Sequence, residues 1–110
     1  MTNGISYIYV ETHNWGKTVK FWQQMGFELQ LDLGSSGTLV HPAGGSSLFI
    51  QEVPADRALE IHMCLAAPDD QSTPGAPAVV TKTWHDSHWG TRLLNMQDPD
   101  GRAAVIEYRP

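Results

Sequence analysis

A glutamate inside the apolar C-terminal segment is the first residue whose type and place suggest chemistry. Glu107 lies between Ile106 and Tyr108, after the sequence "DPDG" of residues 98–101. Pro fixes φ at the second position of a tight turn and Gly supplies a positive φ, so this sequence predicts a hairpin. In its second strand, Glu107 is either solvated, bonded to a neighbouring Tyr or Arg at the rim, or directed into a pocket.

A histidine lies in a second segment with a strand pattern. The sequence "ALEIHMCLAA" of residues 58–67 predicts a strand that contains His62. Because successive side chains alternate between the two faces of a sheet, Glu60 and Cys64 share a face with His62. We expect Cys64 to be a buried small residue, since residues i and i+2 lie roughly 7 Å apart, too far for a thiol–imidazole pair.

Two tyrosines and a glutamate alternate in the first segment, "ISYIYVE" of residues 5–11. This pattern, rich in β-branched and aromatic residues, predicts another strand. Tyr7, Tyr9 and Glu11 share one of its faces, and Ile8 and Val10 suit the opposite face, against a helix.

The elements that must position these side chains can be predicted from periodicity. Residues 15–25 are expected to form a helix with Trp15, Val19 and Trp22 as its buried stripe, Thr12 or Asn14 as its cap and Gly26 as its end. Three short strands separated by "GSSG" and "GG" follow. In the last of these, Phe49 and Gln51 face the same way as Tyr7, and Glu52 has the opposite parity.

The second half repeats this order without its helix. After the strand of residues 58–67 comes "PDDQSTPGAP", whose three prolines and one glycine make a long helix implausible. Three further strands follow. We therefore predict one α+β domain, residues 1–110, built from two tandem βαβββ modules of about 1–54 and 55–110, the second with its helix shortened or lost.

Two stretches resemble a known family. "YIYVETHNWGKTVKFWQQMGFEL" resembles the opening unit of the vicinal oxygen chelate superfamily, which includes glyoxalase I, bleomycin-resistance proteins, extradiol dioxygenases and epimerases. "HWGTRLLNMQDPDGRAAVIEY" resembles its closing hairpin. The resemblance implies that the curled sheets of the two modules form one cup.

The resemblance also implies a metal site, because enzymes of this family hold a divalent ion with four side chains. His62 and Glu107 match two of these positions, and Gln51 or Phe49 stands at a third. Tyr7 stands at the fourth, where a neutral phenol is a poor ligand. The expected metal set is thus His62, Glu107 and Gln51, holding Zn, Ni, Mn or Fe, with a metal-free protein as the equal alternative.

Two functions follow from the resemblance. The first is a small-molecule-binding protein of the bleomycin-resistance kind, whose acidic cup also has aromatic walls. Its expected lining is Tyr7, Tyr9, Phe49, Cys64, Trp84 and Trp89. The alternative is a metal-dependent lyase or isomerase of glyoxalase or epimerase type, with Glu107 or Glu11 as the proton-transferring base.

Composition limits the partners. A net charge of −5 and scattered basic residues argue against nucleic acid and anionic membranes. The single Cys64 favours a reducing cytoplasm. Because no helix is expected over the second sheet, its apolar face should need cover, and we expect a homodimer. The residues expected on that face are Ile61, Met63, Leu65 and Ile106.

Overall fold

The computed structural model describes every residue from Met1 to Pro110. The chain divides into two compact units, which we describe separately. The helix unit is Tyr7–Ile61, and the hairpin unit combines Met1–Ser6 with His62–Pro110. These bounds differ from the expected modules, because the first six residues belong with the second half: Asn3 N donates to Ala66 O, at 2.7 Å.

The helix unit contains one helix and a four-stranded sheet. Its elements are β1 (Ile5–Thr12, whose first two residues lie in the hairpin unit), α1 (Trp15–Gln24), β2 (Glu28–Asp32), β3 (Ser36–Val40) and β4 (Ser47–Glu52). The strand order is β2-β3-β4-β1, with β1 parallel to β4 and the other pairs antiparallel. This is the predicted βαβββ order.

Helix α1 begins where two side chains satisfy its first backbone N–H groups. The cap is Asn14, whose Oδ1 accepts from Lys17 N at 3.0 Å. The Glu52 carboxylate accepts from Trp15 N at 2.8 Å, and a negative charge is favourable at a helix N-terminus. Glu52 was predicted to lie on the face opposite to Phe49 and Gln51. This is confirmed, because its carboxylate reaches the helix.

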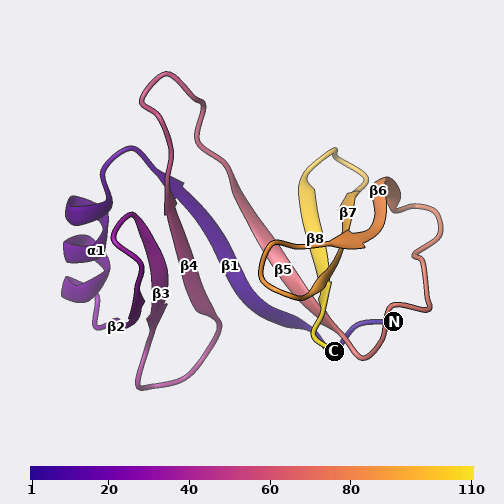
Figure 1. The fold of residues 1–110 in the computed structure, drawn as a ribbon, viewed down its shortest axis with the longest axis horizontal. Coiled ribbons are helices and arrows are strands. Elements are labelled where there is room, and N and C mark those ends of the chain that lie inside the picture. Colours follow the sequence, from indigo (N-terminus) through magenta and orange to yellow (C-terminus); the bar gives the residue numbers. More distant parts are fainter. The chain divides into compact units, whose positions relative to one another are not determined.

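One face of this sheet packs against α1 (Figure 1). The buried core consists of Val19, Leu39, Leu48 and Ile50. Around it pack the residues predicted for this face, among them Ile8, Val10, Trp15 and Trp22. The side chains of opposite parity on β1 and β4 must therefore lie on the face that α1 leaves uncovered.

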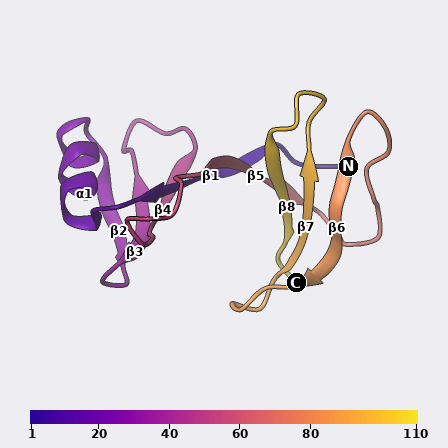
Figure 2. The same ribbon diagram turned by 90° about the horizontal axis from the view of Figure 1, so that it is seen from above.

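The hairpin unit has four strands and no helix (Figure 2), which confirms the predicted loss. Its strands are β5 (Ile61–Ala67, whose first residue lies in the helix unit), β6 (Val79–Asp86), β7 (Arg92–Gln97) and β8 (Ala103–Tyr108). The strand order is β5-β8-β7-β6, with β5 parallel to β8. The predicted turn joins β7 to β8.

The apolar face of the hairpin unit is better covered than expected. Its core is Ala67, Leu94 and Ile106, packed by Leu65, Val80, Trp84, Met96 and Tyr108. The expectation that Leu65 and Ile106 need outside cover is therefore wrong, since Ile106 is only 1% exposed. Ile61 and Met63 do remain exposed, at 70% and 52%.

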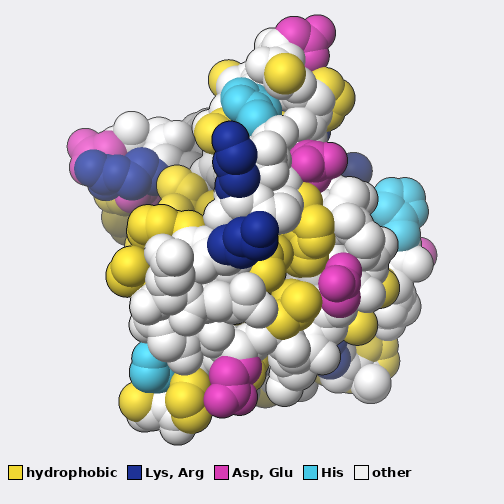
Figure 3. Space-filling model, turned by 90° about the vertical axis from the view of Figure 1, so that its left-hand side faces the viewer, with side chains coloured by type: hydrophobic (Ala, Val, Ile, Leu, Met, Phe, Trp, Pro, Cys, Tyr) yellow, Lys and Arg dark blue, Asp and Glu magenta, His cyan; other side chains and the backbone are white.

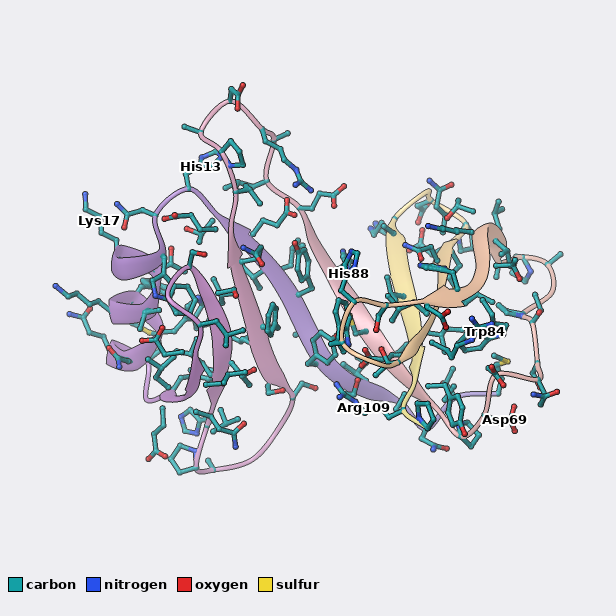
Figure 4. All side chains as sticks on the ribbon, in the orientation of Figure 1. His13, Lys17, Asp69, Trp84, His88 and Arg109 are labelled. Atoms are coloured by element: carbon teal, nitrogen blue, oxygen red, sulfur yellow. The ribbon has the colours of Figure 1, made fainter.

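Trp84 packs against this core, whereas it was expected to line the ligand site. Its indole Nε1 donates to the backbone oxygen of Ser72 at 2.9 Å, so the ring is tied to the segment that replaces the missing helix. Figure 4 shows the Trp84 side chain well away from His88 of the β6–β7 turn. Trp84 thus packs on the face opposite to Glu107, which follows Ile106 in β8.

The outer surface of the helix unit shows separate basic groups among hydrophobic and polar side chains, not a continuous basic area (Figure 3). No helix of the structure has the length and apolar character needed to cross a membrane.

Candidate functional site

Three rings line the uncovered face of the helix unit, and we call them the aromatic ladder: Tyr7, Tyr9 and Phe49. Tyr9 lies directly beside Phe49 in the parallel pairing of β1 with β4, with ring centroids 6.5 Å apart and planes at 12°. The Tyr7 ring meets Phe49 edge-on, at 6.5 Å and 62°. All three side chains are partly exposed, so part of the aromatic surface of the ladder is accessible.

A buried carboxylate closes one end of the ladder. Glu11 is 4% exposed, and its Oε2 accepts from the Tyr9 hydroxyl at 2.7 Å and from Arg57 Nη2 at 2.9 Å. Its Oε1 accepts from the backbone N of Glu60 at 3.1 Å. The charge is therefore compensated by one cation and two neutral donors, as a buried ion requires.

The tyrosine hydroxyl is held as a donor by this arrangement. Burial raises the pKa of Tyr9 well above its ordinary value, and the hydrogen bond to Glu11 and the charge of that carboxylate raise it further. Ionised Tyr9 would face the Glu11 carboxylate directly, which explains the direction of the shift. Tyr9 therefore stays neutral, with its ring orientation fixed by the Glu11 contact.

Glu107 has closely similar surroundings in the hairpin unit. Its carboxylate is buried, with the residue 3% exposed. Oε2 accepts from Trp89 Nε1 and from Thr91 Oγ1, both at 2.8 Å, and Oε1 pairs with Arg109 Nη2 at 2.9 Å. Of the alternatives given for Glu107, the structure shows a carboxylate bonded to neighbouring side chains. The residue is buried, however, and does not lie at the rim.

Other expected site residues of the hairpin unit share the face of Glu107. Cys64 pairs with Val105 in the β5–β8 register, and His62 lies two residues before Cys64 on the same strand. Cys64 is a buried free thiol, 2% exposed. On β7, Asn95 pairs with Val105, and its buried Oδ1 has no hydrogen-bond partner within the protein.

Neither unit by itself brings a group of metal-ligating side chains together. No group of three or more His, Cys, Asp or Glu residues lies together in a way that could hold a metal ion. The expected set divides between the units, with Gln51 in one and His62 and Glu107 in the other. Gln51 Nε2 donates to the backbone oxygen of Glu52 at 2.9 Å. Glu107 Oε2 already accepts two hydrogen bonds, and its Oε1 is ion-paired with Arg109.

Two residues that compensate the buried carboxylates were not predicted from the sequence: Arg57 and Thr91. A neighbouring Arg was one of the alternatives for Glu107, and in the structure it is Arg109. Arg109 had a signal, because a residue two positions beyond Glu107 on a strand lies on the same face. Arg57 and Thr91 had none, since Arg57 lies 46 positions from Glu11 and Thr91 lies 16 positions from Glu107.

The fold has known counterparts among solved structures. A member of the glyoxalase/bleomycin resistance protein/dioxygenase superfamily from Vibrio splendidus 12B01 is similar, with a TM-score of 0.67, 12% identity, and coverage of 93% of this chain and 96% of that one. The halotolerant catechol dioxygenase BphC gives a TM-score of 0.62 at 13% identity, with 98% of this chain matching 40% of that longer chain. No family model and no curated protein matches the sequence.

The chain therefore has the fold of the glyoxalase/bleomycin resistance/dioxygenase superfamily, which is the vicinal oxygen chelate fold. At this level of identity the likeness establishes the fold, and the activity has to be argued from the side chains.

Proposed function

We propose that this protein binds a small, flat or amphipathic molecule on the aromatic ladder of the helix unit. The observation that carries the proposal is the contiguous arrangement of Tyr7, Phe49 and Tyr9 on the face that α1 leaves uncovered. Partly exposed rings give a planar ligand a large contact area, and their faces attract π systems and cations. We also propose a cytoplasmic location, from the single free Cys64.

The side chains support binding better than they support the alternative of a metal-dependent lyase or isomerase. A base for such a reaction must reach a substrate proton. Glu11 and Glu107 are both buried. Both oxygens of Glu11 already accept hydrogen bonds, and Glu107 has one oxygen that accepts hydrogen bonds and one that is ion-paired with Arg109. The expected third ligand, Gln51, carries no charge to stabilise a divalent ion.

The proposal can be tested with three ring probes of similar size and different charge. Indole, naphthalene-2-carboxylate and N-methylquinolinium are each titrated into ¹⁵N-labelled protein while backbone amide shifts are recorded. We expect at least one probe to bind saturably and to shift amides of β1 and β4 near Tyr9 and Phe49. Shifts confined to two exposed apolar residues, Phe21 of α1 and Met25 at its C-terminal cap, would contradict the proposal.

The charge of the preferred probe defines the ligand class. A preference for N-methylquinolinium would indicate a cationic ring, which the acidic chain favours. A preference for naphthalene-2-carboxylate would indicate that the ligand forms an ion pair with Arg57, whose side chain is 54% exposed. Failure of all three probes at millimolar concentration would overturn the proposed function.

A further inference from the structure

An asparagine of the hairpin unit is followed directly by a glycine. The pair is Asn3-Gly4, whereas Asn14 and Asn95 precede a tryptophan and a methionine. Because glycine has no side chain, nothing attached to the second residue hinders its backbone nitrogen from approaching the side-chain amide of the first. The Asn-Gly pair is therefore suited to cyclisation, a reaction of the chain with itself that needs no enzyme.

The peptide group inside this pair is free, although the groups on both sides of it are held. Asn3 N donates to Ala66 O at 2.7 Å, and Ala66 N donates to Gly4 O at 3.0 Å. Between these two bonds, Asn3 O and Gly4 N have no hydrogen-bond partner within the protein. Gly4 has a φ of 91°, and both residues are exposed. The free peptide group can therefore rotate until its nitrogen faces the side-chain amide.

The comparable pairs elsewhere in the chain are held. Asn14 Oδ1 caps α1 by accepting a backbone hydrogen bond, and Asn95 lies within the paired strand β7 with its Oδ1 buried. Asp100-Gly101 of the β7–β8 turn could cyclise by the same route, but Gly101 N donates to Asp98 O at 2.9 Å. Of these pairs, only the Asn-Gly pair combines an exposed side-chain amide with an unbonded backbone nitrogen.

We propose that Asn3 is a site of spontaneous covalent modification, at which Gly4 N attacks the side-chain carbon Cγ. The N–Cγ bond forms and the Cγ–Nδ2 bond breaks, and the proton of Gly4 N leaves with Nδ2 as ammonia. Water then opens the resulting succinimide ring at one of its two carbonyl groups. Opening at Cγ gives aspartate at position 3, and opening at the backbone carbonyl gives isoaspartate.

Isoaspartate would alter how the first residues are attached to β5. Its main chain runs through Cβ and Cγ, so the link between Asn3 N and Gly4 O becomes one carbon longer. Both of these atoms bond to the single residue Ala66, and the longer link cannot keep the two bonds together. We therefore expect the modification to release residues 1–4 from β5, and both products add a negative charge.

The modification is tested by storing the folded protein for several weeks at mildly alkaline pH, where the attacking nitrogen loses its proton more readily. Peptide mass spectrometry, with fragmentation that distinguishes aspartate from isoaspartate, follows each position. We expect conversion at Asn3 into both products, while Asn14 and Asn95 stay intact. Asn3→Gln is the matched control, because its longer amide forms a larger ring more slowly. An intact Asn3, or conversion no faster than at Asn14, would overturn the proposal.

The structural consequence is tested by hydrogen exchange of the Ala66 amide, which Gly4 O protects in the unmodified protein. The isoaspartate form, separated by its charge and identified by mass spectrometry, should lose this protection. Freshly purified Asn3→Asp should keep it, because that variant adds the charge without lengthening the main chain. Full protection in the isoaspartate form would overturn the release of the segment. Equal loss in Asn3→Asp would overturn the argument from main-chain length.

Discussion

At the scale of single residues, Glu11 shows what a buried charge demands of its neighbours. Its carboxylate lies below the surface and is compensated by Tyr9, Arg57 and a backbone N–H. Removing one partner of such a group leaves a buried charge with one donor fewer, and water does not readily replace that donor at a buried site. Stability should therefore respond strongly to small changes around it.

Tyr9→Phe should lower the free energy of unfolding by about 1–2 kcal/mol, because it deletes only the hydroxyl that donates to the buried carboxylate. The matched control is Tyr108→Phe, a partly buried tyrosine packed on the core of the hairpin unit. Its loss should stay below about 0.5 kcal/mol. Urea unfolding of the two variants checks this, and equal losses would contradict the account of Glu11.

The raised pKa of Tyr9 also predicts how stability depends on alkaline pH. Because the pKa in the folded state lies above the unfolded value of 10.0, the contribution is complete below pH 10.0 and is lost as pH rises through the folded pKa. The wild type should thus lose stability more steeply than Tyr9→Phe above that pH. Parallel curves for the two proteins would show that Tyr9 is not the group responsible.

At the scale of elements, the sequence predicts regular periodicity well and irregular strands poorly. The stripe of Trp15, Val19 and Trp22 places α1 correctly, since helical period and capping are local properties. Alternation gives no reliable face for Trp84, because β6 has register shifts between Val80 and Lys82 and between Lys82 and His85. An extra residue at a bulge reverses the faces that simple alternation assigns.

The same limit applies to the candidate site. Alternation along β1 correctly put Tyr7, Tyr9 and Glu11 on one face, because that strand pairs with β4 without a shift. The compensating Arg57 arrives from a loop distant in the chain. No local sequence pattern determines such a contact. The sequence therefore predicted that Glu11 belongs to the site but not that Arg57 is its partner.

The β7–β8 turn supplies a prediction at acid pH. Asp98 Oδ1 accepts from the backbone N of Arg102 and of Asp100, both at 2.9 Å. The bond from Arg102 N is the main reason that the pKa of Asp98 is lowered. A lowered pKa gives stability that is present above the unfolded value of 3.8 and lost as pH falls through the folded value.

Asp98→Ala should therefore lower Tm near neutral pH, and the difference from the wild type should shrink as pH falls below 3.8. Asp100→Ala is the control, because the side chain of Asp100 bonds only to the exposed Arg102 guanidinium. Thermal melts over acid pH check both. A difference for Asp98→Ala that does not change with pH would contradict this role.

At the scale of the whole molecule, two apolar side chains on β5 stay exposed and pack into the core of neither unit. Ile61 and Met63 alternate onto one face of β5 and are 70% and 52% exposed. The core of the hairpin unit covers Leu65, further along the strand. We retain the homodimer as a prediction on the basis of these two residues, since exposed neighbouring apolar groups favour association.

A dimer predicts an equilibrium-sedimentation mass of two chains at micromolar concentration. Met63→Lys should shift this mass towards one chain, because a charge at the centre of an apolar contact must be desolvated. Val79→Lys, at an exposed apolar residue of β6, should leave the mass unchanged. A wild-type mass of one chain would contradict the prediction.

The central claim is that the aromatic ladder binds a small planar ligand, and the affinity of Phe49→Ala for the best ring probe tests it most directly. Phe49 contacts both tyrosine rings, so its loss should weaken binding roughly tenfold, about 1.4 kcal/mol. Phe21→Ala, which removes an exposed ring of α1, should bind as the wild type does. Equal affinity of a folded Phe49→Ala protein and the wild type would contradict the claim.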